Sequence, residues 1–112
     1  MENFVYYFHR WLYPEEGILL TAKNAKKMME KCEIQLIVDA RTRAEWDNGH
    51  FKGARNIPLT GVSHVKFSEL HENTGILVYC NNGSRASRMA ATIMEYGFKY
   101  VYYINTSYWE IT

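Results

Sequence analysis

Residues 76–85 read Ile-Leu-Val-Tyr-Cys-Asn-Asn-Gly-Ser-Arg, and they carry the most informative pattern in the chain. Its apolar first half predicts a buried strand that ends at Cys80. Gly83 permits a tight turn, and residues 84–96 favour a helix. This order of strand, turn and helix places the Cys80 thiol beside the unpaired N–H groups that begin the helix. We therefore expect Cys80 to ionise readily and to act as a nucleophile.

The same alternation of strand and helix runs through the rest of the chain. Strands are expected at 18–20, 34–38, 76–79 and 100–104, with a return to the sheet over 49–57, and helices after Thr21 to about 31, at 44–47, at 65–70 and at 84–96, with a final helical turn. Strands alternating with helices in a short chain predict an α/β fold, in which a mainly parallel central sheet carries helices on both faces. A functional site is expected where the strands end.

Length and composition limit the classes of function. The 112 residues suit one domain with one core. Hydrophobic residues make up 47%, charged residues 22%, and the net charge is +1, so the basic excess typical of nucleic-acid-binding proteins is missing. No run approaches the ~20 apolar residues that span a bilayer, and the N-terminus does not read as a signal peptide. We expect a cytoplasmic protein with no nucleic-acid partner and no membrane span.

Residues 1–17 are expected to form an N-terminal amphipathic helical extension, with the main domain at 18–112. Its aromatic and apolar residues recur at helical spacing over 3–12. Packing on the domain is the preferred role, followed by a dimer contact and then by membrane binding.

The two cysteines are not expected to pair. Cys32 precedes a predicted strand whereas Cys80 follows one, so they lie at opposite edges of a parallel sheet, beyond disulfide reach. We expect Cys32 to be a small, partly buried residue at the start of its strand. The sequence lacks Cys/His spacing typical of a zinc site, and we expect no metal and no cofactor.

The loop that follows Cys80 has the composition of an anion cradle, and here the chain resembles the rhodanese-like sulfurtransferases. Asp39-x-Arg41 and Glu45-Trp46, with the stretch 49–58, are similar to the family's first signature. Near the C-terminus, Trp109 falls where the family places a tryptophan. The resemblance covers about residues 18–110 and implies a rhodanese-like fold.

The resemblance also implies a function and roles for individual residues. Cys80 is the catalytic nucleophile that takes a sulfane sulfur from thiosulfate or a persulfide and passes it to cyanide, a thiol or a protein acceptor. Arg85 steers the anionic donor, and Arg41 and Arg88 are candidates to line the site. Asp39, Arg41 and His50 look structural in the family. The implied anion- and substrate-binding residues are Asn81, Asn82, Gly83, Ser84 and Arg85.

Two departures from the family pattern bear on the site. Asn81 and Asn82 are neutral where members efficient with thiosulfate often carry a basic side chain, which weakens the case for thiosulfate as donor. The family's paired glycines before the tryptophan appear as Ile104-Asn105, so we expect a reshaped turn.

Other functions remain open. One is a rhodanese-fold binding or regulatory module without turnover. Another, less favoured, is a phosphatase or arsenate reductase of the same fold, because those loops have one more residue than the Cys-x4-Arg spacing found here.

Overall fold

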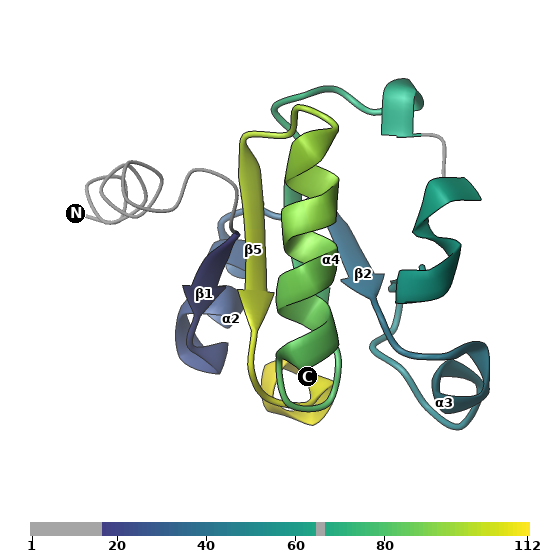
Figure 1. The fold of residues 1–112 in the computed structure, drawn as a ribbon. Coiled ribbons are helices and arrows are strands. Elements are labelled where there is room, and N and C mark those ends of the chain that lie inside the picture. Colours follow the sequence, from purple (N-terminus) through teal and green to yellow (C-terminus); the bar gives the residue numbers. More distant parts are fainter. Residues whose placement is uncertain (1–16, 65–66) are drawn as a thin grey trace.

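The computed structural model describes residues 17–64 and 67–112. Its described strands form one parallel five-stranded sheet in the order β1-β5-β4-β2-β3 (Figure 1). These strands are β1 (Ile18–Leu20), β2 (Leu36–Asp39), β3 (Arg55–Asn56), β4 (Gly75–Tyr79) and β5 (Tyr100–Ile104). The predicted α/β class with a parallel sheet is confirmed.

Helices cover both faces of the sheet, as predicted. The described helices are α2 (Ala22–Glu30), α3 (Arg43–Asp47) and α4 (Ser84–Glu95), with 3-10 turns at Leu59–His64, Phe67–Glu69 and Tyr108–Ile111. Helix α4 packs on one face, whereas α2 and the last 3-10 turn pack on the other. Figure 1 shows α3 beyond the end of β2, away from the sheet faces.

Strand β4 occupies the middle of the sheet, and all of its residues are buried. Side chains alternate along a strand, so Ile76 and Val78 join the core under α4, whereas Leu77 and Tyr79 join the core under α2. A continuous apolar run is what a strand covered on both faces requires. The buried central strand therefore places Cys80 directly after its carboxyl end, in the middle of the sheet.

The predicted element boundaries agree with the structure at the start of α2 and differ from it at two other places. Thr21 is the N-cap of α2 and accepts a hydrogen bond from the Asn24 N–H, as predicted. The strand expected at 34–38 instead spans Leu36–Asp39. In place of a helix at 65–70, the structure has the 3-10 turns Leu59–His64 and Phe67–Glu69.

The prediction for Cys32 was wrong. Cys32 is exposed and lies in the turn after α2, where it has a φ of 58° and its N–H donates to the Met29 carbonyl. A left-handed residue after a helix is normally glycine. The helix ends at its C-cap Lys31, so Cys32 takes part in that ending rather than in the start of a strand.

The predicted N-terminal helix over 3–12 lies outside the described residues, and the division into 1–17 and 18–112 stays a prediction. Within the described part of the chain, no helix is both long enough and apolar enough to cross a membrane.

Candidate active site

Cys80 lies between the end of β4 and the start of α4, at the end of the sheet toward which the strands point (Figure 1). The residue is fully buried. Its Sγ accepts hydrogen bonds from the backbone N–H of Gly83 at 3.1 Å and of Ala86 at 3.3 Å. Both donors come from the N-cap and first turn of α4, where backbone N–H groups have no partner within the helix.

Gly83 makes this loop possible for two reasons. It is the N-cap of α4 with a φ of 94°, a conformation that favours glycine. A Cβ at this position would also lie 2.8 Å from the Cβ and 2.9 Å from the Cα of Asn105. Among the described residues, Cys32 is the only non-glycine with a positive φ, so Ile104 and Asn105 do not adopt the left-handed turn of paired glycines.

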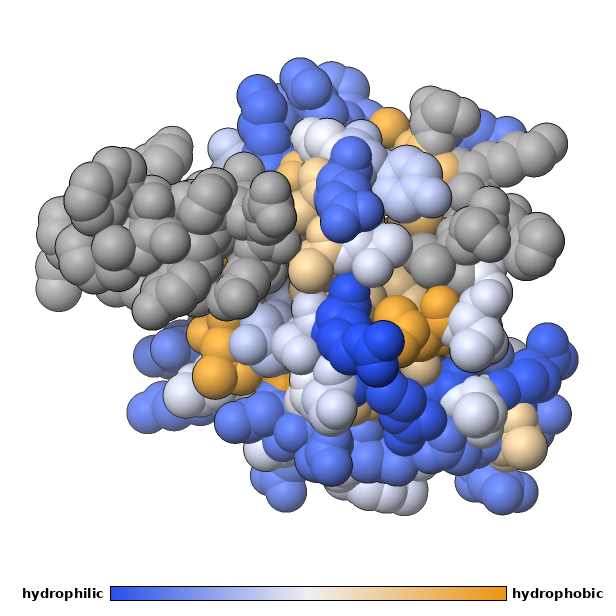
Figure 2. Space-filling model, in the orientation of Figure 1, coloured by the Kyte–Doolittle hydropathy of each residue, from blue (hydrophilic) through white to orange (hydrophobic). Residues whose placement is uncertain are grey.

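The side chains of the other loop residues have different partners. Asn82 Oδ1 accepts a hydrogen bond from the Ser84 N–H at 3.1 Å, which supports the first turn of α4. Asn81 Nδ2 donates to Glu45 Oε2 at 2.9 Å. The solvent-facing side of the loop is polar, because its exposed residues are Asn81, Asn82 and Ser84. Figure 2 shows a largely hydrophilic surface at this end of the molecule.

Arg85 is held by a carboxylate. Its two terminal nitrogens donate to the two oxygens of Glu45, at 2.6 and 3.1 Å. This paired hydrogen bond raises the pKa of Arg85 and holds the pKa of Glu45 well below its usual range. The sequence predicted that Arg85 would meet the anionic donor, whereas the structure directs both terminal nitrogens to Glu45.

Glu45 is the site residue whose role sequence reasoning missed. It is the third residue of α3 and closes a capping box, in which the N–H and hydroxyl of Thr42 donate to its Oε1 and its own N–H donates to Thr42 Oγ1. One signal was available, because Thr42-x-x-Glu45 is the sequence pattern of a capping box. Glu45, Asn81 and Arg85, joined by these hydrogen bonds, are named the Glu45 clasp.

Because folding lowers the pKa of Glu45, we expect the contribution of the Glu45 clasp to the free energy of unfolding to depend on pH. A carboxylate whose pKa is lowered by folding stabilises the fold above its unfolded pKa of about 4.3, and that contribution is lost as pH falls toward the folded value. Glu45→Gln removes the titrating group. We expect wild type to be more stable than this variant near neutral pH, and the difference in urea unfolding free energy to shrink below about pH 4. An equal difference at about pH 7 and about pH 3 would contradict the clasp.

A second ion pair lies behind the loop. Asp39 is fully buried, and its Oδ2 accepts hydrogen bonds from Arg41 at 2.7 Å and from the Tyr79 hydroxyl at 2.7 Å. Arg41 also donates to the Gly49 carbonyl at 2.6 Å. Burial raises the pKa of Tyr79, which keeps its hydroxyl a donor. The structure thus places Asp39 and Arg41 between the end of β2 and the loop at Gly49.

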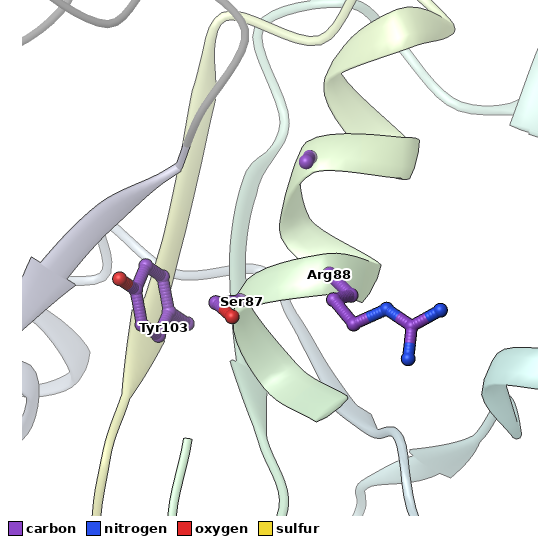
Figure 3. A pocket seen from close by; sticks show the side chains of 4 residues that line it. Ser87, Arg88 and Tyr103 are labelled. Carbon is purple, nitrogen blue, oxygen red and sulfur yellow. The ribbon is translucent and has the colours of Figure 1, made fainter. Parts of the chain in front are cut away.

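The remaining candidate residues lie apart from the clasp. Arg41 is buried, and its guanidinium donates to Asp39 and the Gly49 carbonyl and lies over the rings of Tyr79 and Tyr108. Its place in a donor site stays a prediction. Arg88 is exposed on α4, beside a pocket of about 280 Å³ lined by Ser87, Arg88, Ala91 and Tyr103. Figure 3 shows Arg88 extending away from Tyr103. His50 stacks on Trp46 with ring centroids 3.7 Å apart.

Known proteins resemble this chain in sequence and in fold. The family model of the rhodanese-like domain matches residues 21–112. A Buchnera aphidicola protein named tRNA uridine(34) hydroxylase is 34% identical over 93 residues, which are 79% of this chain and 30% of that protein. YrkF of Bacillus subtilis, named "Putative sulfur carrier protein", is 34% identical over 76 residues, which are 68% of this chain and 40% of that protein. The match spans less than half the length of either relative.

Solved structures share the fold. A rhodanese-like domain protein of Staphylococcus aureus superposes with a TM-score of 0.71 at 18% identity, over 85% of this chain and 91% of that chain. The rhodanese-like domain of an Anabaena protein gives 0.70 at 23% identity, over 83% and 71%. Parallel sheet, cysteine loop and family match agree, and the chain belongs to the rhodanese-like domain family.

Proposed function

We propose that this chain is a sulfurtransferase that carries a sulfane sulfur on Cys80 as a persulfide. The observation that carries the proposal is the pair of backbone N–H groups, from Gly83 and Ala86, that donate to Cys80 Sγ at the start of a 12-residue helix. Backbone N–H donors of this kind stabilise negative charge on sulfur, which lies on Sγ in a thiolate and on the outer sulfur in a persulfide. Membership of the family and the name of the relative YrkF support the same chemistry.

The reaction consists of two displacements. The Cys80 thiolate attacks the outer sulfur of the donor, a new S–S bond forms, and the donor's S–S bond breaks. The leaving group departs with the electron pair: sulfite from thiosulfate, or a thiolate from a persulfide. An acceptor thiolate or cyanide then attacks the outer sulfur and releases the Cys80 thiolate, so no external oxidant or reductant is needed. The scheme contains no general base, because the attacking group is the thiolate itself.

A binding or regulatory module would share the fold but would not complete this cycle. Retention of Cys80 with its two N–H donors supports turnover over that alternative. The two functions differ in one observable, which is the release of transferred sulfur to an added acceptor.

The donor is proposed to be a persulfide in preference to thiosulfate. Thiosulfate is a dianion, and its approach to a thiolate is unfavourable unless fixed positive charge compensates. Asn81 and Asn82 supply no charge, and Arg85 is paired with Glu45 at 2.6 Å. Loop charge therefore limits the use of a dianionic donor.

This proposal predicts a gain of activity from added charge. Asn81→Arg should raise thiosulfate kcat/KM roughly fivefold, the effect of ~1 kcal/mol for one unit-charge contact in water-like surroundings, and should change persulfide turnover less. Asn82→Arg should act in the same direction; each variant loses one wild-type hydrogen bond, from Asn81 Nδ2 to Glu45 or from the Ser84 N–H to Asn82 Oδ1. Parallel assays with both donors measure this. Strong wild-type thiosulfate turnover that neither variant changes would contradict the charge argument, and no sulfur transfer from either donor would contradict the proposed function.

A further inference from the structure

We propose that Glu45 is a specificity-determining residue that sets the charge met by a sulfur donor at the Cys80 loop. By holding Arg85, its carboxylate lowers the positive field at the site, so donors of low negative charge are favoured over dianions. The inference rests on the proposed function for its biological meaning. Its physical content, the charge preference of the Cys80 sulfur, can be measured without sulfur transfer.

The carboxylate is fixed from both sides. Arg85 and Asn81, both from the Cys80 loop, contact its two oxygens at 2.6 to 3.1 Å. From the opposite side, the N–H and hydroxyl of Thr42 donate to its Oε1 at 3.1 and 3.0 Å. The Arg85 and Glu45 side chains are about one third exposed, at 32% and 31%, so the pair lies at the edge of the loop rather than free in solvent. A carboxylate with this many donors is held in one position.

The charges near Cys80 follow from this geometry. An unpaired Arg85 would add one positive charge to the N–H donors of the loop and would attract an anion. When Arg85 is paired with Glu45, the negative charge of the carboxylate largely cancels the positive charge that an approaching sulfur donor would meet. A dianion must either approach beside this carboxylate or displace it from Arg85. A donor with little charge meets neither cost.

Alkylation with two reagents of similar size tests the inference. Iodoacetate is an anion and iodoacetamide is neutral, and both react with a thiolate, so the ratio of their rates at Cys80 reports the local field. Because Cys32 is exposed, the measurement uses a Cys32→Ser background. Glu45→Gln is the test variant, since glutamine also suits the third position of a capping box. Asp47→Asn is the matched control: Asp47 lies on the same helix, is exposed and pairs with Arg43.

We expect Glu45→Gln to raise the iodoacetate-to-iodoacetamide rate ratio by about threefold or more, and Asp47→Asn to change it by less than about 1.5-fold. Glu45→Asp keeps the negative charge on a side chain that is one methylene shorter. We expect this variant to raise the iodoacetate-to-iodoacetamide rate ratio less than Glu45→Gln does. Thermal unfolding shows whether each variant is folded. If Glu45→Gln does not fold, Glu45→Asp replaces it as the test variant. An unchanged ratio in the folded Glu45 variants, or an equal rise in Asp47→Asn, would overturn the inference.

The same proteins separate this inference from the proposed function. If the ratio rises but no donor transfers sulfur, Glu45 controls the field and the sulfurtransferase proposal fails. If sulfur is transferred and the ratio does not change, the proposed function stands and the role of Glu45 is wrong. If both hold, Glu45→Gln should also raise thiosulfate kcat/KM relative to persulfide kcat/KM.

Discussion

Cys80→Ser is expected to abolish sulfur transfer, reducing it to the rate measured without protein. A serine hydroxyl cannot form a persulfide, so neither displacement can occur. The fold should survive, because the smaller Oγ can still accept hydrogen bonds from the Gly83 and Ala86 N–H groups that now meet Sγ. Steady-state assays with thiosulfate and with a persulfide donor measure the loss, and circular dichroism and thermal unfolding check the fold.

Cys32→Ser is the control for this variant. Cys32 is exposed in the turn after α2, whereas Cys80 is buried at the end of β4, so loss of the Cys32 thiol should leave transfer unchanged. Sulfur transfer by a folded Cys80→Ser protein would show that the chemistry lies elsewhere in the chain.

Asp39→Ala is expected to give the largest loss of stability, about 3–5 kcal/mol in the free energy of unfolding. Asp39 is fully buried and accepts hydrogen bonds from the backbone and side chain of Arg41 and from the Tyr79 hydroxyl. Its removal leaves the Arg41 charge buried with no carboxylate to balance it. Urea unfolding followed by circular dichroism measures the change.

Asp47→Ala provides the comparison for a surface ion pair. Asp47 pairs with Arg43 at 3.0 Å, but the two side chains are 57% and 71% exposed, so its loss should cost less than about 1 kcal/mol. Equal losses in the two alanine variants would contradict the central place that the structure gives to Asp39. A destabilised Asp39→Ala protein should also lose activity, because Asp39, Arg41 and Tyr79 support the base of the Cys80 loop.

Features of the fold encoded by neighbouring residues could be predicted from the sequence. The apolar run before Cys80 predicts the central strand, because its side chains have to be buried on both faces. Thr21 predicts the start of α2, since its hydroxyl accepts from an N–H three residues later. Gly83 predicts the turn into α4, where its φ is 94°. Each of these patterns involves only residues that are close together in the sequence. Rules of periodicity and helix capping, which compare neighbouring residues, can therefore detect them.

Contacts between distant residues could not be predicted in this way. Arg85 and Glu45 lie 40 positions apart, and the capping box fixes the rotamer of Glu45 without indicating that a second loop will meet it. Tyr79 and Asp39 are also 40 positions apart, and the hydroxyl of Tyr79 is hidden within what reads as an apolar run. Cys32 was misplaced for a different reason. The left-handed residue that ends a helix is usually glycine, so a glycine predicts a helix end. Cys32 takes this conformation although it is not glycine, and the sequence therefore does not indicate it.

Mass spectrometry can detect directly whether Cys80 carries sulfane sulfur. The protein is exposed briefly to a low-molecular-weight persulfide or to thiosulfate, digested without reductant, and the Cys80 peptide is measured before and after addition of an acceptor thiol. We expect a gain of one sulfur atom on Cys80, faster from the persulfide than from thiosulfate, and its loss when the acceptor is added. A Cys80 peptide that gains no sulfur from either donor, in a folded wild-type protein, would show that Cys80 is not a sulfur carrier.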